Sequence, residues 1–459
     1  MSVSTWATTV GVEHPAPSAP PSPRASLSAA APRPVRTNPS EPPSAEAVAQ
    51  PGTRRARLRR QLGSLAHVVG VGPVILLMTA GVAVVGARAE SVREAVNGGT
   101  WPGPYVLGLV LILVPAAVGI AAPRPRAATP VALAAAAAVL MQIVFVLAGR
   151  VPATAGSSTA LDLVTRAVRD LSGVPEEAIT TAVLTASNVL LAATFLLLVA
   201  HVTRSARIGA LAVVAYAATL SLPVGPEYAS MPLALALAVL AAYLVVTRQR
   251  GFSGSIAAAV FALVAVGLTD VATTVVVLMG LVGWLVLEVV LRRQRSNSVL
   301  PLAVLVGTAL VVTAVALTRP ATLPRLTALD VRADSPVPWV TWQGAPEWAS
   351  WAAGGAAVVV LLVSGLGLWR SRFFVPLRVS LAVLLAVAAT LELLVLLGHL
   401  TSVMAGFAGW APPFVSLAFA FVGSWWFFQW RPQWWRAVLL GAGVAVVLLG
   451  TVVGYAGAG

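Results

Sequence analysis

The sequence predicts an all-α fold: a polytopic transmembrane helical bundle with a cytoplasmic N-terminus and an extracytoplasmic C-terminus. The first observation is composition, since 58% of the 459 residues are hydrophobic and only 10% are charged. A water-soluble domain cannot bury so much apolar surface, because its surface-to-volume ratio limits burial. The second is a series of apolar runs, each about the length of a membrane-crossing helix. The third is a regular alternation of charge between the connections that join these runs.

The N-terminal segment 1–60 differs in composition from the rest of the chain. Residues 1–52 are rich in Pro, Ala and Ser, and such a segment buries too little apolar area to offset its ordering entropy. No apolar core closely follows the first methionine, so the segment does not have the pattern of a signal peptide. It ends in the run RRARLRR, Arg54–Arg60, which holds the N-terminus in the cytoplasm and is also suited to anionic lipids. We expect a disordered cytoplasmic tail, followed by a multi-pass domain over 61–459.

About thirteen apolar spans follow, and the charges of their connections test that number. The spans lie near residues 64–86, 104–122, 130–149, 181–201, 208–223, 231–247, 254–269, 272–291, 299–318, 349–369, 374–399, 411–429 and 437–456. Arginine-rich connections occupy every second position, at 123–126, 203–207, 248–250, 292–295, 369–372 and 430–436. Nearly all the acidic residues lie in the connections between these, and a missed span would have broken the alternation. The arginine side is therefore predicted to be cytoplasmic.

The longest connections, at 87–103, 150–180 and 319–348, all lie on the predicted outer side. Loops that only reverse the chain can be very short, so the residues free to build a site are extracytoplasmic. Segment 150–180 contains STALDLVTRAVRDLSGVPEEAI, whose apolar and charged residues separate onto different helix faces. We expect a short amphipathic helix in the outer membrane interface there.

Composition also excludes several classes of chemistry. The chain has no cysteine, which rules out disulfides, thiolate-bound zinc, iron–sulfur clusters and thiol catalysis. Its four histidines are scattered without ligand spacing, and no P-loop motif occurs. The isoelectric point of about 11.6 reflects arginines in short loops, so nucleic acid is not an expected partner. All the basic residues are arginines, which is typical of GC-rich, for example actinobacterial, genomes. No cofactor is required, and a divalent metal stays open.

The first outer segment carries the clearest group of candidate residues. Glu90 and Glu94 are four residues apart and share a face if the segment is helical, with Arg88 and Arg93 beside them. Such a carboxylate can deprotonate an acceptor hydroxyl, and an arginine can bind a phosphate through two hydrogen bonds. The alternative is a solvated helix with local ion pairs.

Further candidates lie in later outer segments. Glu227 occupies a tight turn, and Asp270 lies where two spans meet with almost no loop; either is a binding residue or a simple turn charge. Trp339 and Trp342 lie in a loop near acids, where aromatic faces suit sugars or lipid head groups. Within spans, Glu288 precedes Arg292 by four residues and is expected to pair with it. Glu392 has no partner nearby in the sequence, and it either relays protons or is protonated and hydrogen-bonded.

Residues 180–295 contain a series of short motifs: N-x-L-L-x-A from Asn188, the arginine turn TRSAR, an outer turn with Glu227 before PLALA, a second arginine turn, and the pair Thr269–Asp270. In these motifs the segment resembles the membrane region of GT-C-type glycosyltransferases, which take sugars from polyprenyl-phosphate donors. The resemblance implies an essential carboxylate in the first large outer loop. The family usually has an Asp or an acidic pair there; in this sequence Glu90 and Glu94 occupy the position, with no Asp.

If the first two spans are an addition, segment 150–180 corresponds to that loop instead, and Asp162 becomes the catalytic candidate. The resemblance implies a cell-membrane enzyme whose partners are membrane lipids, a polyprenyl-phosphate sugar and a glycan or lipid acceptor of the cell envelope. Two alternatives stay open. One is a transporter or flippase of an envelope precursor that uses Glu392; the other is a non-catalytic subunit for envelope assembly.

Overall fold

The structure of the chain is a computed structural model. It describes residues 71–97, 102–122, 128–149, 159–220, 231–247, 254–291, 299–318, 364–373 and 411–429, together with short helical pieces at 377–378, 381–382 and 385–386. All of these residues belong to the unit that runs from Gln61 to Gly459. These residues are almost all helical, and no strand occurs among them. The predicted all-α class is therefore confirmed for the described part of the chain.

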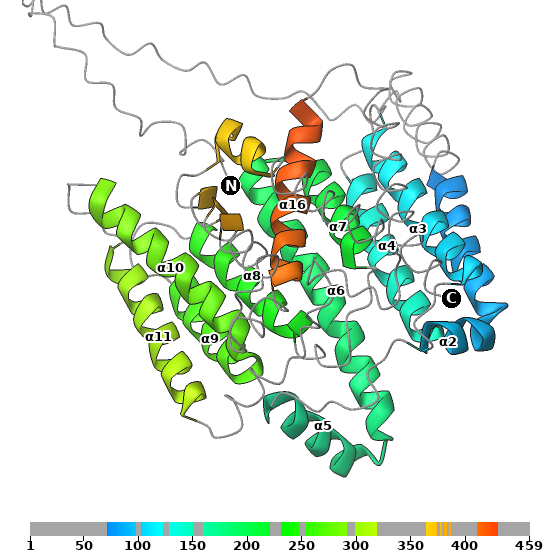
Figure 1. The fold of residues 1–459 in the computed structure, drawn as a ribbon, viewed down its shortest axis with the longest axis horizontal. Coiled ribbons are helices and arrows are strands. Elements are labelled where there is room, and N and C mark those ends of the chain that lie inside the picture. Colours follow the sequence, from blue (N-terminus) through cyan, green and yellow to red (C-terminus); the bar gives the residue numbers. More distant parts are fainter. Residues whose placement is uncertain are drawn as a thin grey trace, which may run out of the picture. The chain divides into compact units, whose positions relative to one another are not determined.

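Figure 1 shows the helices coloured in the order in which they follow one another along the chain. A first helix runs over Val71–Gly86. The labelled helices are α2 (Ala89–Asn97), α3 (Gly103–Ala121), α4 (Ala128–Leu147), α5 (Thr159–Ser172), α6 (Glu176–Thr203), α7 (Ala206–Leu220), α8 (Met231–Thr247), α9 (Gly254–Thr269), α10 (Val271–Leu291), α11 (Val299–Leu317) and α16 (Ala411–Gln429).

Within the described residues, five helices are long and apolar enough to cross a membrane: α3, α4, α6, the 273–290 part of α10, and α11. The helix Val71–Gly86 adds a sixth span if it is counted with α2, from which it is bent by 73°. Shorter apolar helices lie within α7, α8, α9 and α16. The chain is thus an integral membrane protein with several spans. The total of thirteen, and the side on which each terminus lies, stay predictions.

α6 is longer than its predicted span at 181–201, because it begins at Glu176 and has 28 residues. Pro175 is the N-cap residue, and Glu176 and Glu177 occupy the first turn, where carboxylates interact favourably with the helix dipole. The helix ends at Arg204, whose φ of 54° is left-handed and stops the helical repeat. The hydropathy pattern missed the first turn because that turn is polar.

The buried side chains form two main clusters that meet at α8. One gathers residues of the first helix and of α2, α3, α4, α6, α7, α8 and α16, and the other gathers residues of α8, α9, α10 and α11. In Figure 1, α9, α10 and α11 lie together on one side, α3 and α4 lie on the other, and α6, α7 and α8 lie between them. α8 packs against both α6 and α9 and so connects the two groups.

Small residues allow close helix crossings, which is typical of membrane proteins, where dispersion contacts rather than water expulsion hold helices together. A Cβ atom on Gly81 of the first helix would lie 2.6 Å from the carbonyl oxygen of Gly108 in α3. The two backbones are therefore in direct contact, and neither position has room for a side chain.

Contacts between helix ends give the direction of each helix. Gly209, early in α7, lies against Leu196 and Ala200, late in α6, so these two helices are antiparallel. His201 of α6 contacts Tyr243 of α8 at 5.8 Å between ring centroids, and both residues are near the ends of their helices. α6 and α8 are therefore parallel. α9 follows α8 in the chain and packs against it in the antiparallel direction, so it ends towards the side of the bundle on which α6 begins, although the longer α6 extends further.

Arg207 binds three helices together at the opposite end of the bundle. Its Nε donates to the Ile120 carbonyl at 3.0 Å, and Nη2 donates to the carbonyls of Ala121, at 2.7 Å, and Ala122. The same guanidinium lies 5.2 Å from the centre of the Phe428 ring in α16. A cation suits the C-terminus of a helix, so Arg207 both caps α3 and joins it to α7 and α16.

Candidate functional site

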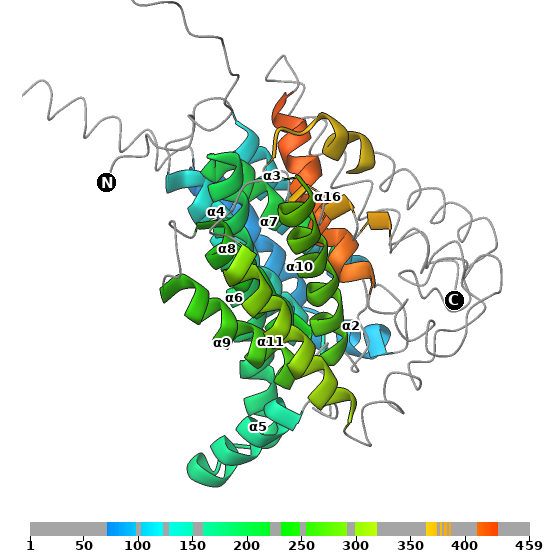
Figure 2. The ribbon, with the colours of Figure 1, turned by 90° about the vertical axis from the view of Figure 1, so that its left-hand side faces the viewer.

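The candidate residues that the structure describes lie at the end of the bundle where α6 begins. They occupy three places: α2, α5 and the junction between α9 and α10. Both views place α2 and α5 towards this same end, and α5 extends beyond the neighbouring helices (Figure 1, Figure 2). Arg207 lies at the other end, so the described charges separate largely as the alternating connections predict.

The segment that carries Glu90 and Glu94 is helical, so these two residues do lie on one face of α2. Both side chains are exposed. Val92, between them, is fully buried and anchors α2 to the core. The sharp bend from the first helix therefore orients the two carboxylates towards solvent.

Arg93 extends from α2 over the end of α4. Its side chain lies so close to Gly149 that a Cβ atom there would be 2.6 Å from Arg93 Cγ. Gly149 has a φ of 68° and terminates α4, so glycine fits both the left-handed backbone and the close approach. Arg88 is exposed at the bend. α2 thus presents Arg93 and two glutamates on a short solvent-facing helix, and Arg88 lies just before its first residue.

α5 carries the third catalytic candidate, Asp162, and packs against α6 and α9. Thr165, which is 1% exposed, is the buried residue among the described side chains of this helix. Asp162 precedes Thr165 by three residues, so the two positions are neighbours on the helix surface. Because α5 packs against α9, and α9 ends towards this side of the bundle, α5 carries position 162 on the same side as the α9–α10 junction.

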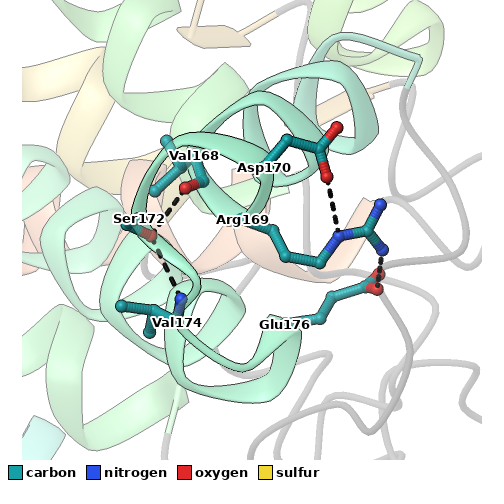
Figure 3. A network of polar contacts seen from close by, with 6 residues as sticks. All are labelled: Val168, Arg169, Asp170, Ser172, Val174 and Glu176. Carbon is teal, nitrogen blue, oxygen red and sulfur yellow. Dashed lines mark hydrogen bonds and ion pairs between the residues drawn. The ribbon is translucent and has the colours of Figure 1, made fainter.

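A polar network fixes the elbow between α5 and α6 (Figure 3). Arg169 donates from Nε to Asp170 at 3.1 Å and from Nη1 to Glu176 at 3.2 Å. Ser172 donates to the Val168 carbonyl at 2.6 Å and accepts from the Val174 amide at 3.2 Å. Between them, Gly173 has a φ of 67°. Arg169 therefore joins the last turn of α5 to the first turn of α6.

Asp270 is buried and separates α9 from α10 as a single residue. Its Oδ2 accepts a hydrogen bond from the Thr273 amide at 2.7 Å, and its carbonyl accepts from Thr274 Oγ1 at 2.8 Å. These contacts make Asp270 the N-cap of α10, which favours the structural interpretation of this residue. A role in substrate binding stays a prediction.

The candidates divide into two groups. Glu90, Arg93 and Glu94 lie on α2 beside the end of α4, and together with Arg88 at the preceding bend they form the α2 group. Asp162 and Asp270 belong to the region of α5, α6 and α9. Glu288 is buried in α10, and its expected partner Arg292 lies outside the described residues. The same holds for other predicted residues: Glu227, Trp339, Trp342 and Glu392.

Sequence reasoning missed two polar features inside the bundle. Asn188 of α6 donates from Nδ2 to Gln142 Oε1 of α4 at 3.0 Å. Gln142 is a lone amide in an apolar span, and this pattern in the sequence indicates a polar contact inside the bundle. Thr273 and Thr313 are buried in α10 and α11. The burial of their hydroxyls could not be predicted from the sequence, because threonine is common in membrane helices.

The chemistry open to the α2 group follows from its residue types. A solvent-facing carboxylate can accept a proton from a hydroxyl, and a nearby guanidinium can bind a phosphate oxygen. Among the described residues, no three His, Cys, Asp or Glu side chains gather as a metal site would require. The α2 group therefore has the residue types for acid–base work on an anionic substrate.

No protein-family model matches this sequence, and no curated protein matches it significantly.

Proposed function

We propose that this integral membrane protein is a glycosyltransferase of the cell membrane, which moves a sugar from a polyprenyl-phosphate donor to an extracytoplasmic acceptor. The observation that carries the proposal is the common location of α2 and α5. These two short helices hold the candidate carboxylates Glu90, Glu94 and Asp162, and both lie at one end of a bundle of apolar helices. A lipid-linked donor keeps its chain in the membrane and its reactive sugar phosphate at such a surface.

The end that carries α2 and α5 is assigned to the outer side by the distribution of arginine. Arg204 and Arg207 lie at the opposite end, and arginine-rich connections are retained in the cytoplasm. This orientation places the carboxylates where envelope acceptors occur.

In the proposed reaction, one carboxylate removes the proton from the acceptor hydroxyl. The hydroxyl oxygen then bonds to the anomeric carbon of the sugar while the bond from that carbon to the phosphate oxygen breaks. Polyprenyl phosphate leaves with the electron pair, and the carboxylic acid later releases its proton to solvent. Arg88 or Arg93 binds the phosphate and stabilises its charge as it leaves.

The test is transfer of a labelled sugar from polyprenyl-phosphate donors in vesicles that contain the purified chain. Glu90→Gln, Glu94→Gln and Asp162→Asn each remove one candidate base without a large change of shape. Glu177→Gln is the matched control, because Glu177 is an exposed carboxylate at the same end and is not a candidate. Loss of a general base typically lowers the rate by about 10²–10⁴-fold.

The proposal predicts that one of the three variants loses transfer by this factor while the control keeps it. If all four variants transfer sugar at the rate of the unsubstituted chain, none of the three candidate carboxylates is the base. If no donor supports transfer but the vesicles accumulate a lipid-linked precursor, the chain is a transporter and the proposal is wrong.

A further inference from the structure

We propose that the elbow between α5 and α6 docks onto the lipid headgroup layer, with Val168, Leu171 and Val174 inserted among the lipids. These three apolar side chains are 41%, 90% and 39% exposed. Exposed apolar side chains that gather in one place mark a surface that something else covers. The occupant inferred here is the membrane itself, whichever reaction the protein performs.

The first argument is the pattern of α5. Val168 and Leu171 continue a series of apolar positions that begins with Leu161 and Val164, at alternating spacings of three and four residues. This spacing places all four on one helix face. The described part of the bundle leaves Val168 and Leu171 exposed, whereas Thr165 of the same helix is buried. Val168 and Leu171 are therefore available to another surface.

The second argument is continuity with a surface that faces lipid. α6 crosses the membrane, and its exposed small and apolar residues follow one another along one face. They are Ala182, Ala186, Leu190, Ala193 and Leu197. Ala178 continues this exposed face to the start of α6, next to Val174 and the elbow. The lipid-facing surface of the span therefore leads directly to the exposed residues of the elbow.

The third argument is depth. With 28 residues, α6 is about 42 Å long at about 1.5 Å per residue. The hydrocarbon core is about 30 Å thick, and the headgroup regions add about 5–8 Å on each side. A tilt of about 20° shortens the span to about 39 Å. The tilted helix is longer than the hydrocarbon core is thick. When this extra length is shared between the two ends, the start of α6 lies within the headgroup layer rather than far out in water.

The fourth argument is the arrangement of charge. Figure 3 shows Arg169, Asp170 and Glu176 on one side of the elbow and Val168 and Val174 on the other. Interfacial helices separate their faces in this way, with apolar residues among the acyl chains and charged residues towards water. Because Arg169 is tied to both Asp170 and Glu176, the charged side is held away from the apolar side.

The absence of cysteine from the chain permits a direct test with single cysteines. Val168→Cys and Leu171→Cys report on the apolar face, and Arg166→Cys and Asp170→Cys are matched controls on the charged face of the same helix. Each full-length variant is labelled with a fluorophore in lipid nanodiscs. Quenching is measured with lipids that carry a quencher near the headgroup, and with iodide in the water.

The proposal predicts lipid quenching at least about twofold stronger at positions 168 and 171 than at the controls, with the reverse order for iodide. A second variant, Leu171→Asp, should lower lipid quenching of a label at position 168, since a charge there opposes insertion.

Two results would overturn the proposal. Equal and strong iodide quenching at all four positions would place the elbow in water. Protection from both quenchers, together with rapid disulfide-linked dimers of Leu171→Cys under oxidation, would show that a second copy covers this face. A folding defect is recognised separately, because all variants are compared by gel filtration before labelling.

Discussion

The carboxylate of Asp270 accepts a 2.7 Å hydrogen bond from the Thr273 amide and thereby caps the first turn of α10. The contact lies in the buried junction at which α9 ends and α10 begins. Two apolar helices follow each other here with a single residue between them, and the free amides of α10 need an acceptor. Asp270 supplies that acceptor within the chain.

Replacement of Asp270 distinguishes this capping role from substrate binding. Asp270→Ala removes the acceptor and should lower the free energy of unfolding by about 1 kcal/mol. Asp270→Asn keeps an oxygen at the cap and should leave stability nearly unchanged. Unfolding in detergent by a denaturant titration measures both. If Asp270→Asn abolishes sugar transfer while it keeps full stability, the residue has a role in the reaction beyond the cap.

The crossing of Gly81 and Gly108 should tolerate no added carbon. Gly81→Ala brings a Cβ atom to 2.6 Å from the Gly108 carbonyl oxygen, which is backbone and cannot rotate away. We expect a loss of about 1–3 kcal/mol in the free energy of unfolding, the usual cost of overpacking. Gly307→Ala in α11 is the control, since nothing lies within 4 Å of that position. Equal stability of the two variants would mean that the first helix and α3 do not cross here.

The hydrogen bond between Asn188 and Gln142 should contribute modestly to stability. Asn188→Leu and Gln142→Leu, measured alone and together, form a double-mutant cycle. The coupling energy expected for such an interhelical pair is about 0.6 kcal/mol. A coupling energy of zero would mean that the Asn188 and Gln142 side chains do not interact and that α4 and α6 are not joined here. A much larger value would point to a bound polar partner shared by both side chains.

Arg207 should not be replaceable by lysine. Arg207→Ala loses the charged hydrogen bonds to the end of α3 and the contact with Phe428, and should cost about 2 kcal/mol of stability. Arg207→Lys should recover only part of this, because an ammonium cannot reach several carbonyls and cover the ring together. The control is Arg204→Gln, whose side chain is exposed and whose effect should stay within about 0.5 kcal/mol. If Arg207→Lys were as stable as the unsubstituted protein, the positive charge alone would account for the stabilisation by Arg207.

Much of the fold could be predicted because apolar length and charge are local properties. The described spans begin and end within a few residues of the predicted ones, as α8 and α9 do at both ends. α6 departs from this because Glu176 and Glu177 begin a helix by their interaction with its dipole, which hydropathy does not register. The amphipathic segment in 150–180 is helical, as its spacing predicts.

The site could be predicted less well, because its features depend on contacts between distant residues. In the sequence, Asp270 lies at a junction where a turn charge and a helix cap have the same pattern; only its contact with the Thr273 amide identifies a cap. Arg207 belonged to an arginine turn, and nothing local indicated the end of α3, more than eighty residues away. The glycine crossing at Gly81 likewise depends on a partner in another helix.

The proposed function requires that the end of the bundle with α2 and α5 faces outward. Single cysteines in this cysteine-free chain test that requirement in intact cells with a membrane-impermeant maleimide. Ser91→Cys on α2 and Glu177→Cys on α6 probe one end, and Arg204→Cys probes the other; all three positions are exposed. Labelling of positions 91 and 177 before lysis, and of position 204 only afterwards, is the predicted result. The reverse pattern would place the candidate carboxylates in the cytoplasm and contradict the proposed reaction.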